Sequence, residues 1–399
     1  MLDPARVDLT DPRVRADPYP LYARLRAEAP VCPIRVGRWL DFWMLTRYED
    51  VVAALKDERF THDLRKVHRA DVQVLRLFGP LNRHMLNRDP PDHPRLRALV
   101  LKAFTARFVE DLRPRIESLT EQLLDRVAGQ GRMDVIADYA LPLPVTIIAE
   151  MLGVPVADRE RFQRWTAALV AFGGAWSVIR AVPSAWALLR YIRQLVRLRR
   201  HRPEKDLISA LVAAEEGGDR LNGTELLAMV GLLLLAGYET TVNLIGNGTL
   251  ALLENPAQMH ELCAHPSLAP SAVEELLRYD GPLNWAPPRW TLCDVTIAGV
   301  TIPRNAGVGL GLNAANRDPE QFERPDVLDL AREPNRHVAF GQGIHYCLGA
   351  PLARLEGQIA FTTLLRRFPD LRLAVPRDAL RWRRSVPLRG LEALPVVLA

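Results

Sequence analysis

Apolar residues recur at the three- to four-residue spacing of an amphipathic helix along most of this chain. This pattern predicts helices over Pro18–Ala29, Arg95–Thr105, Phe108–Val127, Leu143–Met151, Asp158–Phe172, Pro183–Arg200, Gly223–Leu253, Leu268–Tyr279 and Pro351–Phe361. The period-two alternation of a strand is sparse, and it predicts strands over Trp39–Leu45, Val295–Ile302, Val308–Leu312 and Leu391–Leu398. The expected fold is mainly α, with a large helical part and a smaller antiparallel β-rich part.

Composition makes this a globular chain of 399 residues, with 48% hydrophobic and 25% charged residues. No Gly/Ser-rich stretch or block of charge forms a linker, so we expect a single domain over residues 1–399. The N-terminus has no apolar core or cleavage signal. The four cysteines include no CxxC pair. These features indicate a reduced, cytoplasmic protein.

Net charge and apolar runs exclude two classes of partner. The net charge is only +5, and we interpret the arginines at 193, 197, 199, 200 and 202 as the solvated face of a helix, so no nucleic-acid partner is expected. The apolar runs at 166–189 and 226–245 are interrupted by charged or polar residues, Gly173-Gly174 and Pro183. Because a span needs about 20 apolar residues, neither run predicts a membrane helix.

Cys347 has the most distinctive surroundings of any residue in the chain. It lies in Phe340-Gly-Gln-Gly-Ile-His-Tyr-Cys-Leu-Gly349, the cysteine loop, directly before the last predicted helix. Glycines permit a tight turn and the close approach of a flat cofactor. Unpaired N–H groups at a helix start favour thiolate over thiol. A lone thiolate presented in this way suits the axial position of a haem iron, whereas a free cysteine of no special function is a small apolar core residue.

The spacing of Phe340, Gly341, Gly343, His345, Cys347 and Gly349, followed by Leu352-Ala353-Arg354, resembles the haem-binding loop of the cytochrome P450 family. The resemblance extends over one haem domain of a soluble bacterial member and implies haem b (iron protoporphyrin IX). Cys347 would be its iron ligand, and Phe340, Gly341 and Gly349 would surround it.

A second motif, Ala236-Gly-Tyr-Glu-Thr-Thr241, lies in the longest predicted helix. On residues alone, a threonine there could simply bond its own helix. The motif nevertheless resembles the family's oxygen-activation site. The resemblance implies that Ala236 contacts the haem and Gly237 leaves room for dioxygen. It also implies that Thr240 hydrogen-bonds oxygen during its activation and Glu239 helps relay protons. Many relatives have His where this chain has Tyr238.

Glu275 and Arg278 are three residues apart and can pair on one helix face. The family's buried Glu-x-x-Arg has this spacing and implies a structural pair, with Arg332 as third partner. The segment from Asn316 to Asp326 resembles the scaffold that precedes the family's haem loop.

His93 and Arg97 project from one face of a helix start, where Asp92 could serve as the cap. The resemblance implies that these two cationic donors bind the haem propionates, joined by Arg289 and His345. Arg278 and Arg304 remain alternatives to Arg289.

The resemblance places the substrate pocket along apolar segments, and a medium-sized hydrophobic substrate follows. Its walls would come from 60–85, 172–182 with Trp176, and 385–388, and its named residues are Leu232, Leu233, Ala236, Leu283, Asn284, Trp285 and Val386. Asn284 could orient the substrate.

The expected reaction is that of a haem-thiolate monooxygenase, which inserts one oxygen atom from O2 by hydroxylation or epoxidation. Because no flavin or iron–sulfur module is present, electrons would come from a ferredoxin or flavodoxin with its NAD(P)H reductase. Lys102, Arg107 and Arg354 could face that partner. A peroxide-driven peroxygenase and a non-catalytic haem protein that recruits a partner enzyme are the alternatives. The retained Glu239 and Thr240 argue against the first, and the retained Thr240 and Cys347 against the second.

Overall fold

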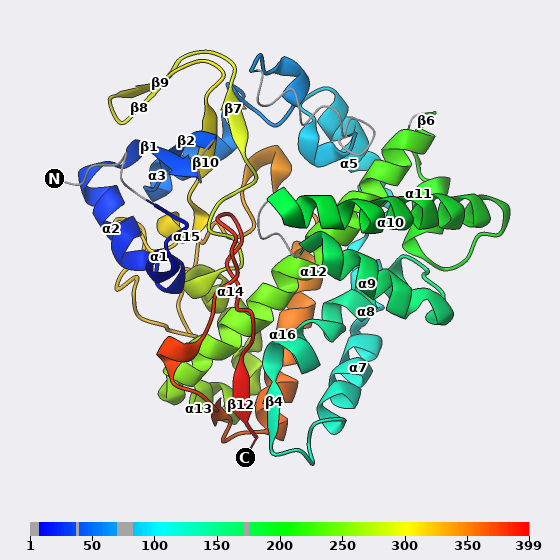
Figure 1. Ribbon diagram of the computed structural model, residues 1–399, viewed down its shortest axis with the longest axis vertical. Helices are drawn as coiled ribbons and strands as arrows, with labels where there is room; N and C mark the ends of the chain where they lie inside the picture. Colours follow the sequence, from blue (N-terminus) through cyan, green and yellow to red (C-terminus); the bar gives the residue numbers. More distant parts are fainter. Residues whose placement is uncertain (1–7, 37–39, 70–82, 171–174, 217, 399) are drawn as a thin grey trace. The chain divides into compact units, whose positions relative to one another are not determined.

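The computed structural model describes residues 8–36, 40–69, 83–170, 175–216 and 218–398. The chain divides into two compact units. The first comprises Met1–Thr61, Glu117–Ala140 and Thr240–Ala399, and the second His62–Ile116 and Leu141–Glu239. Helices α7 (Arg113–Asp125) and α12 (Gly223–Glu254) contribute residues to both units. Figure 1 shows the elements.

The first unit holds most of the strands and the helices of the C-terminal half. Its helices are α1 (Pro12–Ala16), α2 (Tyr19–Glu28), α3 (Tyr48–Lys56), η5 (Val135–Ala140), α13 (Pro256–Ala264), η7 (Pro266–Leu268), α14 (Ala269–Asp280), α15 (Leu312–Ala315), η8 (Gly343–His345), α16 (Ala350–Arg367) and η9 (Arg377–Ala379). Its strands are β1 (Val31–Val36), β2 (Leu40–Leu45), β3 (Phe60–Thr61), β4 (Arg132–Asp134), β7 (Arg289–Thr291), β8 (Val295–Ile297), β9 (Val300–Ile302), β10 (Gly307–Leu310), β11 (Arg372–Leu373) and β12 (Pro395–Val397).

The second unit is helical apart from one short hairpin. Its elements are η2 (Leu64–Lys66), η4 (Met85–Asn87), α5 (Asp92–Ala103), α6 (Ala106–Glu110), α8 (Pro142–Met151), η6 (Val156–Asp158), α9 (Arg159–Val170), α10 (Ala175–His201), α11 (Leu207–Ala213), β5 (Glu215–Glu216) and β6 (Asp219–Arg220). The mainly α expectation is therefore confirmed.

Local sequence chemistry sets the start of the longest helix, α12. The Asn222 side chain accepts hydrogen bonds from the backbone N–H groups of Thr224 (3.0 Å) and Glu225 (2.9 Å). The Glu225 carboxylate in turn accepts from the backbone N–H of Asn222 at 3.0 Å. This reciprocal arrangement is a capping box, which satisfies N–H groups that have no partner inside the helix.

Two helices differ from their predicted extents. The helix expected over 108–127 is divided into α6 and α7. Thr105 caps α6, and Pro114 fits the first turn of α7, where its missing N–H costs no hydrogen bond. Pro183, expected to begin a helix, lies inside α10, which starts at Ala175.

The larger sheet brings together strands from distant parts of the sequence, in the order β1-β2-β10-β7-β3. In Figure 1 the early strand β2 lies beside β10, and β1 pairs with the other edge of β2. The β2–β10 pair is parallel, with Trp43 opposite Val308, and the other pairs are antiparallel. Strand β1 was not predicted, because Pro33 interrupts its pattern. Proline is tolerated at this position because β1 is an edge strand.

Glycines allow close packing of α12, α14 and α16 in the first unit. A Cβ on Gly248 of α12 would lie 2.5 Å from Phe361 Cζ on α16. A Cβ on Gly357 of α16 would meet Val273 of α14 at 3.3 Å and Leu244 of α12 at 3.4 Å. These contacts belong to a buried apolar core that also contains Leu276 and Leu365. Packing against α12 and α14 thereby holds α16 in position. The cysteine loop lies directly before the first residue of α16.

A buried ion pair organises the second unit where α10 ends. Arg199 is only 4% exposed and pairs with Asp206 and Glu204, and it also donates to the Gly153 carbonyl at 2.9 Å. Arg199 therefore departs from the solvated basic face predicted for this helix. Its neighbours Arg193, Arg197, Arg200 and Arg202 are exposed, as expected.

Helix α12 is the one described helix whose length and composition would allow it to cross a membrane. Of its most apolar 18-residue window, 56% is buried within the protein, which is the behaviour of a core helix.

Substitution of two glycines in α12 tests the close packing. Gly248→Ala should lower the free energy of unfolding by about 1–3 kcal/mol, because the added methyl group overlaps the rigid Phe361 ring. Among the described residues, a Cβ at Gly231 would meet no atom within 4 Å. Gly231→Ala should therefore stabilise the protein by up to about 1 kcal/mol through helix propensity. Urea unfolding of both variants checks the pair, and equal effects would contradict the packing argument.

Candidate active site

The cysteine loop lies in the first unit directly before α16, and it contains η8. The backbone N–H of Cys347 donates to the Phe340 carbonyl at 2.9 Å, which closes the loop on itself. Gly341 and Gly343 have φ values of +68° and +73°, a conformation that side chains disfavour. A Cβ on Gly343 would also lie 3.0 Å from the Leu55 carbonyl at the end of α3. These glycines are therefore required by the turn itself.

The donor chemistry of this loop fits a haem iron. Cys347 lies two residues before Gly349, the N-cap of α16, and no side chain caps this 18-residue helix. The first-turn N–H groups and the helix dipole favour negative charge at such a position. A Cβ on Gly349 would lie 3.9 Å from the sulfur, so the glycine keeps space open beside it. A partly buried thiol at an uncapped helix start is the donor that thiolate ligation of haem needs.

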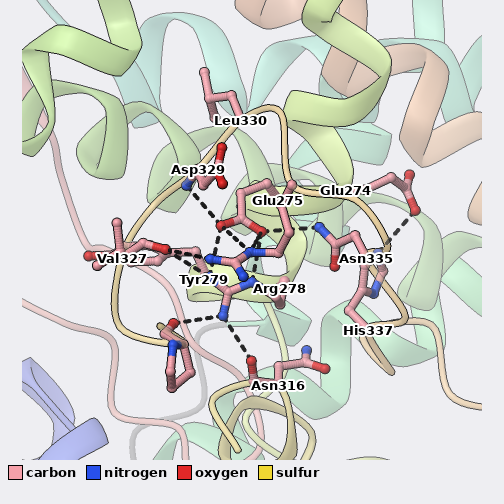
Figure 2. A network of polar contacts seen from close by, with 12 residues as sticks. Glu274, Glu275, Arg278, Tyr279, Asn316, Val327, Asp329, Leu330, Asn335 and His337 are labelled. Carbon is pink, nitrogen blue, oxygen red and sulfur yellow. Dashed lines mark hydrogen bonds and ion pairs between the residues drawn. The ribbon is translucent and has the colours of Figure 1, made fainter. Parts of the chain in front are cut away.

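The predicted pair of Glu275 and Arg278 forms the centre of a buried network (Figure 2). The pair is bidentate, at 2.7 and 2.8 Å, and both side chains are 0% exposed. Arg332 donates to the same carboxylate at 3.1 Å, which makes it the third partner that the resemblance implied. The Asn335 amide also donates to it at 3.1 Å.

Arg278 uses its remaining N–H groups on backbone carbonyls of the segment that leads to the cysteine loop. The acceptors are the carbonyls of Asn316 (3.0 Å), Pro325 (2.7 Å) and Val327 (3.1 Å). The Asn316 side chain accepts from the Val338 backbone N–H at 2.8 Å. The network thus holds residues 316–338 in place, and the part of this segment from Asn316 to Asp326 is the one for which a scaffold role was expected.

His93 and Arg97 both lie on α5 in the second unit. His93 is 1% exposed, and burial together with the Arg97 charge lowers its pKa to about 4. This pKa favours the neutral imidazole, which can donate a hydrogen bond, at neutral pH. Asp92 is the first residue of α5 and not its cap, and its carboxylate accepts from Arg65 at 3.0 Å.

Arg289 and His345 lie in the first unit. Arg289 on β7 is 4% exposed and donates to the carbonyls of Ala54 (2.9 Å) and Leu55 (3.0 Å) at the end of α3. Because Gly343 of the cysteine loop abuts the same Leu55 carbonyl, α3 connects Arg289 to that loop. Of the two alternatives to Arg289, Arg278 is committed to Glu275.

The oxygen-activation motif lies within α12, at the point where the two units divide. Within the second unit, a Cβ on Gly237 would lie 2.9 Å from Ile148 Cδ1 of α8. Gly237 therefore has a packing role toward α8 in addition to any role toward oxygen. Ala236 is exposed, and Glu239 and Thr240 are partly buried.

Glu356 is a candidate functional residue that the sequence analysis missed. It lies on α16, is 1% exposed and hydrogen-bonds to Thr241 of α12. Burial raises its pKa to about 8 despite that hydrogen bond. Among the described residues, Oε2 has no hydrogen-bond partner. The signal in the sequence was an acid on the apolar face of the helix, four residues after Leu352 and four before Ala360, and next to the helix-packing Gly357.

Two of the pocket segments meet in the first unit. Backbone contacts join Leu283 to Leu388 and the Asn284 N–H to the Pro387 carbonyl (2.8 Å). The Asn284 amide donates to Val386 O at 3.1 Å and accepts from Asn313 at 3.3 Å, so its polar atoms already have protein partners.

Other pocket candidates have different environments. Trp285 is 4% exposed and lies in an apolar core cluster that Val386 also contacts. Its large ring therefore fills space in this core. Leu232 and Leu233 are partly buried on α12. Residues 70–82 and 171–174 and the side chain of Trp176 lie outside the described part of the chain.

Comparison with known proteins places this geometry in a family. The family model described as Cytochrome P450 matches residues 185–372. Cytochrome P450 107B1 of Saccharopolyspora erythraea is 51% identical over 387 residues, which cover 95% of each chain. Vitamin D(3) 25-hydroxylase of Pseudonocardia autotrophica is 45% identical over 96% of this chain and 94% of that protein.

The fold has the same relatives. The solved structure of the cytochrome P450 PksS of the Bacillus subtilis bacillaene polyketide synthase matches with a TM-score of 0.94 and 44% identity, covering 98% of this chain and 100% of that chain. The chain belongs to the cytochrome P450 family, and the family expected from its motifs is confirmed. It is therefore an oxidoreductase of the O2-dependent monooxygenase class, whose cofactor is a haem with a thiolate ligand.

Replacement of Glu356 by Gln should change how stability depends on pH. Below the ordinary carboxyl pKa of 4.5, Glu356 is protonated in both folded and unfolded chains. As pH rises to about 8, the unfolded chain releases this proton while the folded protein keeps it, so the folded state loses stability. Gln does not titrate, so the free energy of unfolding of Glu356→Gln should not fall in this window as that of the parent does. The difference between the two proteins should grow by about 1.4 kcal/mol for each pH unit in the window.

Urea unfolding across this pH window measures the difference between the two proteins. Glu254→Gln, at the exposed end of α12, is the control and should keep the parent's slope. Parallel pH profiles for the parent and Glu356→Gln would show that Glu356 is not a buried neutral acid.

Proposed function

We propose that this protein is a haem-thiolate monooxygenase that inserts one oxygen atom from O2 into a medium-sized hydrophobic substrate by hydroxylation or epoxidation. The observation that carries the proposal is the position of Cys347, at the end of a glycine turn and before the uncapped start of α16. Haem b, when bound, would supply the redox chemistry and the activation of dioxygen.

The residues that would hold the cofactor are those that the resemblance implied. Cys347 would donate its thiolate to the iron, with Phe340, Gly341 and Gly349 around it, and Ala236 would contact the ring. Arg97, Arg289 and His345 would pair with the propionates, and neutral His93 would donate a hydrogen bond to one of them. The burial of Arg289 on the α3 carbonyls supports a fixed position for its charge.

Proton delivery would rest on residues of α12 and α16. Thr240 would hydrogen-bond oxygen in the space that Gly237 leaves, and Glu239 would relay protons to it. Glu356 adds a second acid, which holds a proton at neutral pH beside Thr241. Two acids in different environments can hold and pass protons at different stages of one reaction.

The substrate would be medium-sized and apolar. One relative is named for a polyketide synthase and another for the 25-hydroxylation of vitamin D(3), both consistent with an extended hydrophobic substrate. Leu232, Leu233, Ala236 and Leu283 would contribute apolar walls. The polar atoms of Asn284 already have hydrogen-bond partners in the protein, and Trp285 packs in an apolar cluster. We therefore propose that both residues shape the pocket and do not bind the substrate directly.

We further propose that residues 1–399 form one haem domain in the cytoplasm, with no membrane span. Electrons would come from a ferredoxin or flavodoxin with its NAD(P)H reductase. Support for one domain comes from relatives that match this chain over nearly all of both lengths.

The thiolate assignment predicts a spectral change in Cys347→Ala. The carbon monoxide complex of the reduced, haem-loaded protein should show the red-shifted Soret band of thiolate ligation, and this variant should lose it because no sulfur remains to bind the iron. Cys263→Ala, on α13, is the matched control and should keep the band. Persistence of the band in Cys347→Ala would exclude Cys347 as the ligand.

Turnover distinguishes the monooxygenase from a peroxygenase. A hydrophobic compound selected by its type I spectral shift should be oxidised with a ferredoxin, its reductase and NAD(P)H. Thr240→Ala should reduce that rate by about 10²-fold or more, the usual contribution of a positioned proton-transfer group. Turnover with hydrogen peroxide alone, at a rate that Thr240→Ala leaves unchanged, would favour the peroxygenase.

A further inference from the structure

Glu274, directly before Glu275 on α14, is the centre of a second network that reaches the cysteine loop. Its carboxylate pairs with Arg354 of α16 in bidentate geometry, at 2.6 Å from Nε and 2.8 Å from Nη2. His337 Nε2 lies 3.0 Å from the same carboxylate. Figure 2 shows Glu274 turned toward His337, away from the Glu275 carboxylate.

The hydrogen bonds of His337 determine which ring nitrogen carries the proton. The backbone N–H of Ala339 donates to Nδ1 at 3.2 Å, so Nδ1 is an acceptor. Nε2 therefore carries the hydrogen and donates it to Glu274. The side chain is only 3% exposed, and its imidazole ties the chain just before the cysteine loop to α14.

Arg354 contacts two residues of the cysteine loop, Phe340 and Tyr346. Its guanidinium lies 4.6 Å from the centre of the Phe340 ring, where a cation is attracted to the ring face. Its Nη1 donates to the Tyr346 hydroxyl at 3.2 Å. Phe340 accepts the backbone hydrogen bond of Cys347, and Tyr346 precedes that cysteine. One guanidinium thus touches the residues on either side of the turn that presents the sulfur.

The two adjacent carboxylates of α14 hold successive parts of the chain. Glu275 binds Arg332, Asn335 and the Asp329 backbone, which lie before the cysteine loop. Glu274 binds His337 and Arg354, on the two sides of that loop. Burial alone would raise the pKa of Glu274, but hydrogen bonds from Arg354 and His337 lower it to about 2. The carboxylate is therefore charged at every pH of interest.

We propose that Glu274 is a positioning residue for Cys347: through Arg354 and His337 it holds the cysteine loop against α14 and α16, and so keeps the sulfur bonded to the haem iron. This inference rests on the proposed haem-thiolate function. The Arg354 guanidinium is committed to Glu274, Phe340 and Tyr346, although its side chain is 32% exposed.

Glu274→Gln tests the role, because it preserves the shape of the side chain and removes its charge. Glu150→Gln is the matched control. Glu150 also pairs with one arginine in bidentate geometry, Arg115 at 2.8 and 2.8 Å, and with a second donor, Arg159. Its side chain is 18% exposed, against 26% for Glu274. Glu150 lies on α8 in the second unit, apart from the cysteine loop in sequence.

The measurement is the rate at which the reduced carbon monoxide complex loses its thiolate Soret band, compared with urea unfolding of the same samples. Glu274→Gln should lose the band about tenfold faster than the parent, a factor that corresponds to about 1.4 kcal/mol. Glu150→Gln should keep the parent's rate even if its unfolding midpoint falls equally. Arg354→Lys keeps the charge but not the bidentate fork, and it should give an intermediate rate.

The rates of band loss decide the inference. Equal rates of band loss in Glu274→Gln and Glu150→Gln would overturn it, and so would an unchanged rate in Arg354→Lys if Glu274→Gln failed to fold. A parent protein that never shows the thiolate band would instead refute the proposed function. Faster band loss confined to Glu274→Gln and Arg354→Lys supports the positioning role.

Discussion

The buried ion pairs of the Glu275 carboxylate are the interaction on which the rest of the first unit depends. The carboxylate is fully buried, and an isolated charge in that position would be strongly destabilising. The charge is tolerated because Arg278, Arg332, Asn335 and a backbone N–H all donate to it. Each of these donors comes from a defined point of the chain, so satisfying the carboxylate also arranges the segment that precedes the cysteine loop.

Close helix packing supplies the second constraint on the sulfur. Gly248 and Gly357 let α12, α14 and α16 approach more closely than larger residues would allow. The start of α16 is thereby fixed against the same helix that carries Glu274 and Glu275. A loop of glycines is intrinsically flexible, and its position here comes from the packing at one end and from polar contacts along its length.

The same packing creates the environment of Glu356. An acid on a helix that is buried against its neighbours has little water around it, and burial therefore favours its neutral form. The hydrogen bond to Thr241 places this proton next to the motif that carries Glu239 and Thr240. Helix packing and the proposed proton supply are thus linked through one residue of α16.

The local signals of this chain were sufficient for most of its longer helices, the family and the position of Cys347, but the shorter helices α3, α11 and α13 were not predicted. The predicted features depend on short-range spacing: helical periodicity, a glycine turn before a helix, and Glu and Arg three residues apart. Strand β1 was missed because Pro33 masks the alternation, and Pro183 was read as a helix start although it lies inside α10.

Only the tertiary structure could decide the state of charged and polar side chains, because their behaviour depends on neighbours far away in the sequence. Burial on α5 makes His93 neutral, and α16 gives Glu356 a raised pKa. Arg354 looked like a surface cation until Glu274, 80 residues away, was seen to bind it. The sequence by itself determined which groups are present and which spacings they have; the folded chain determined which of them carry charge and what they touch.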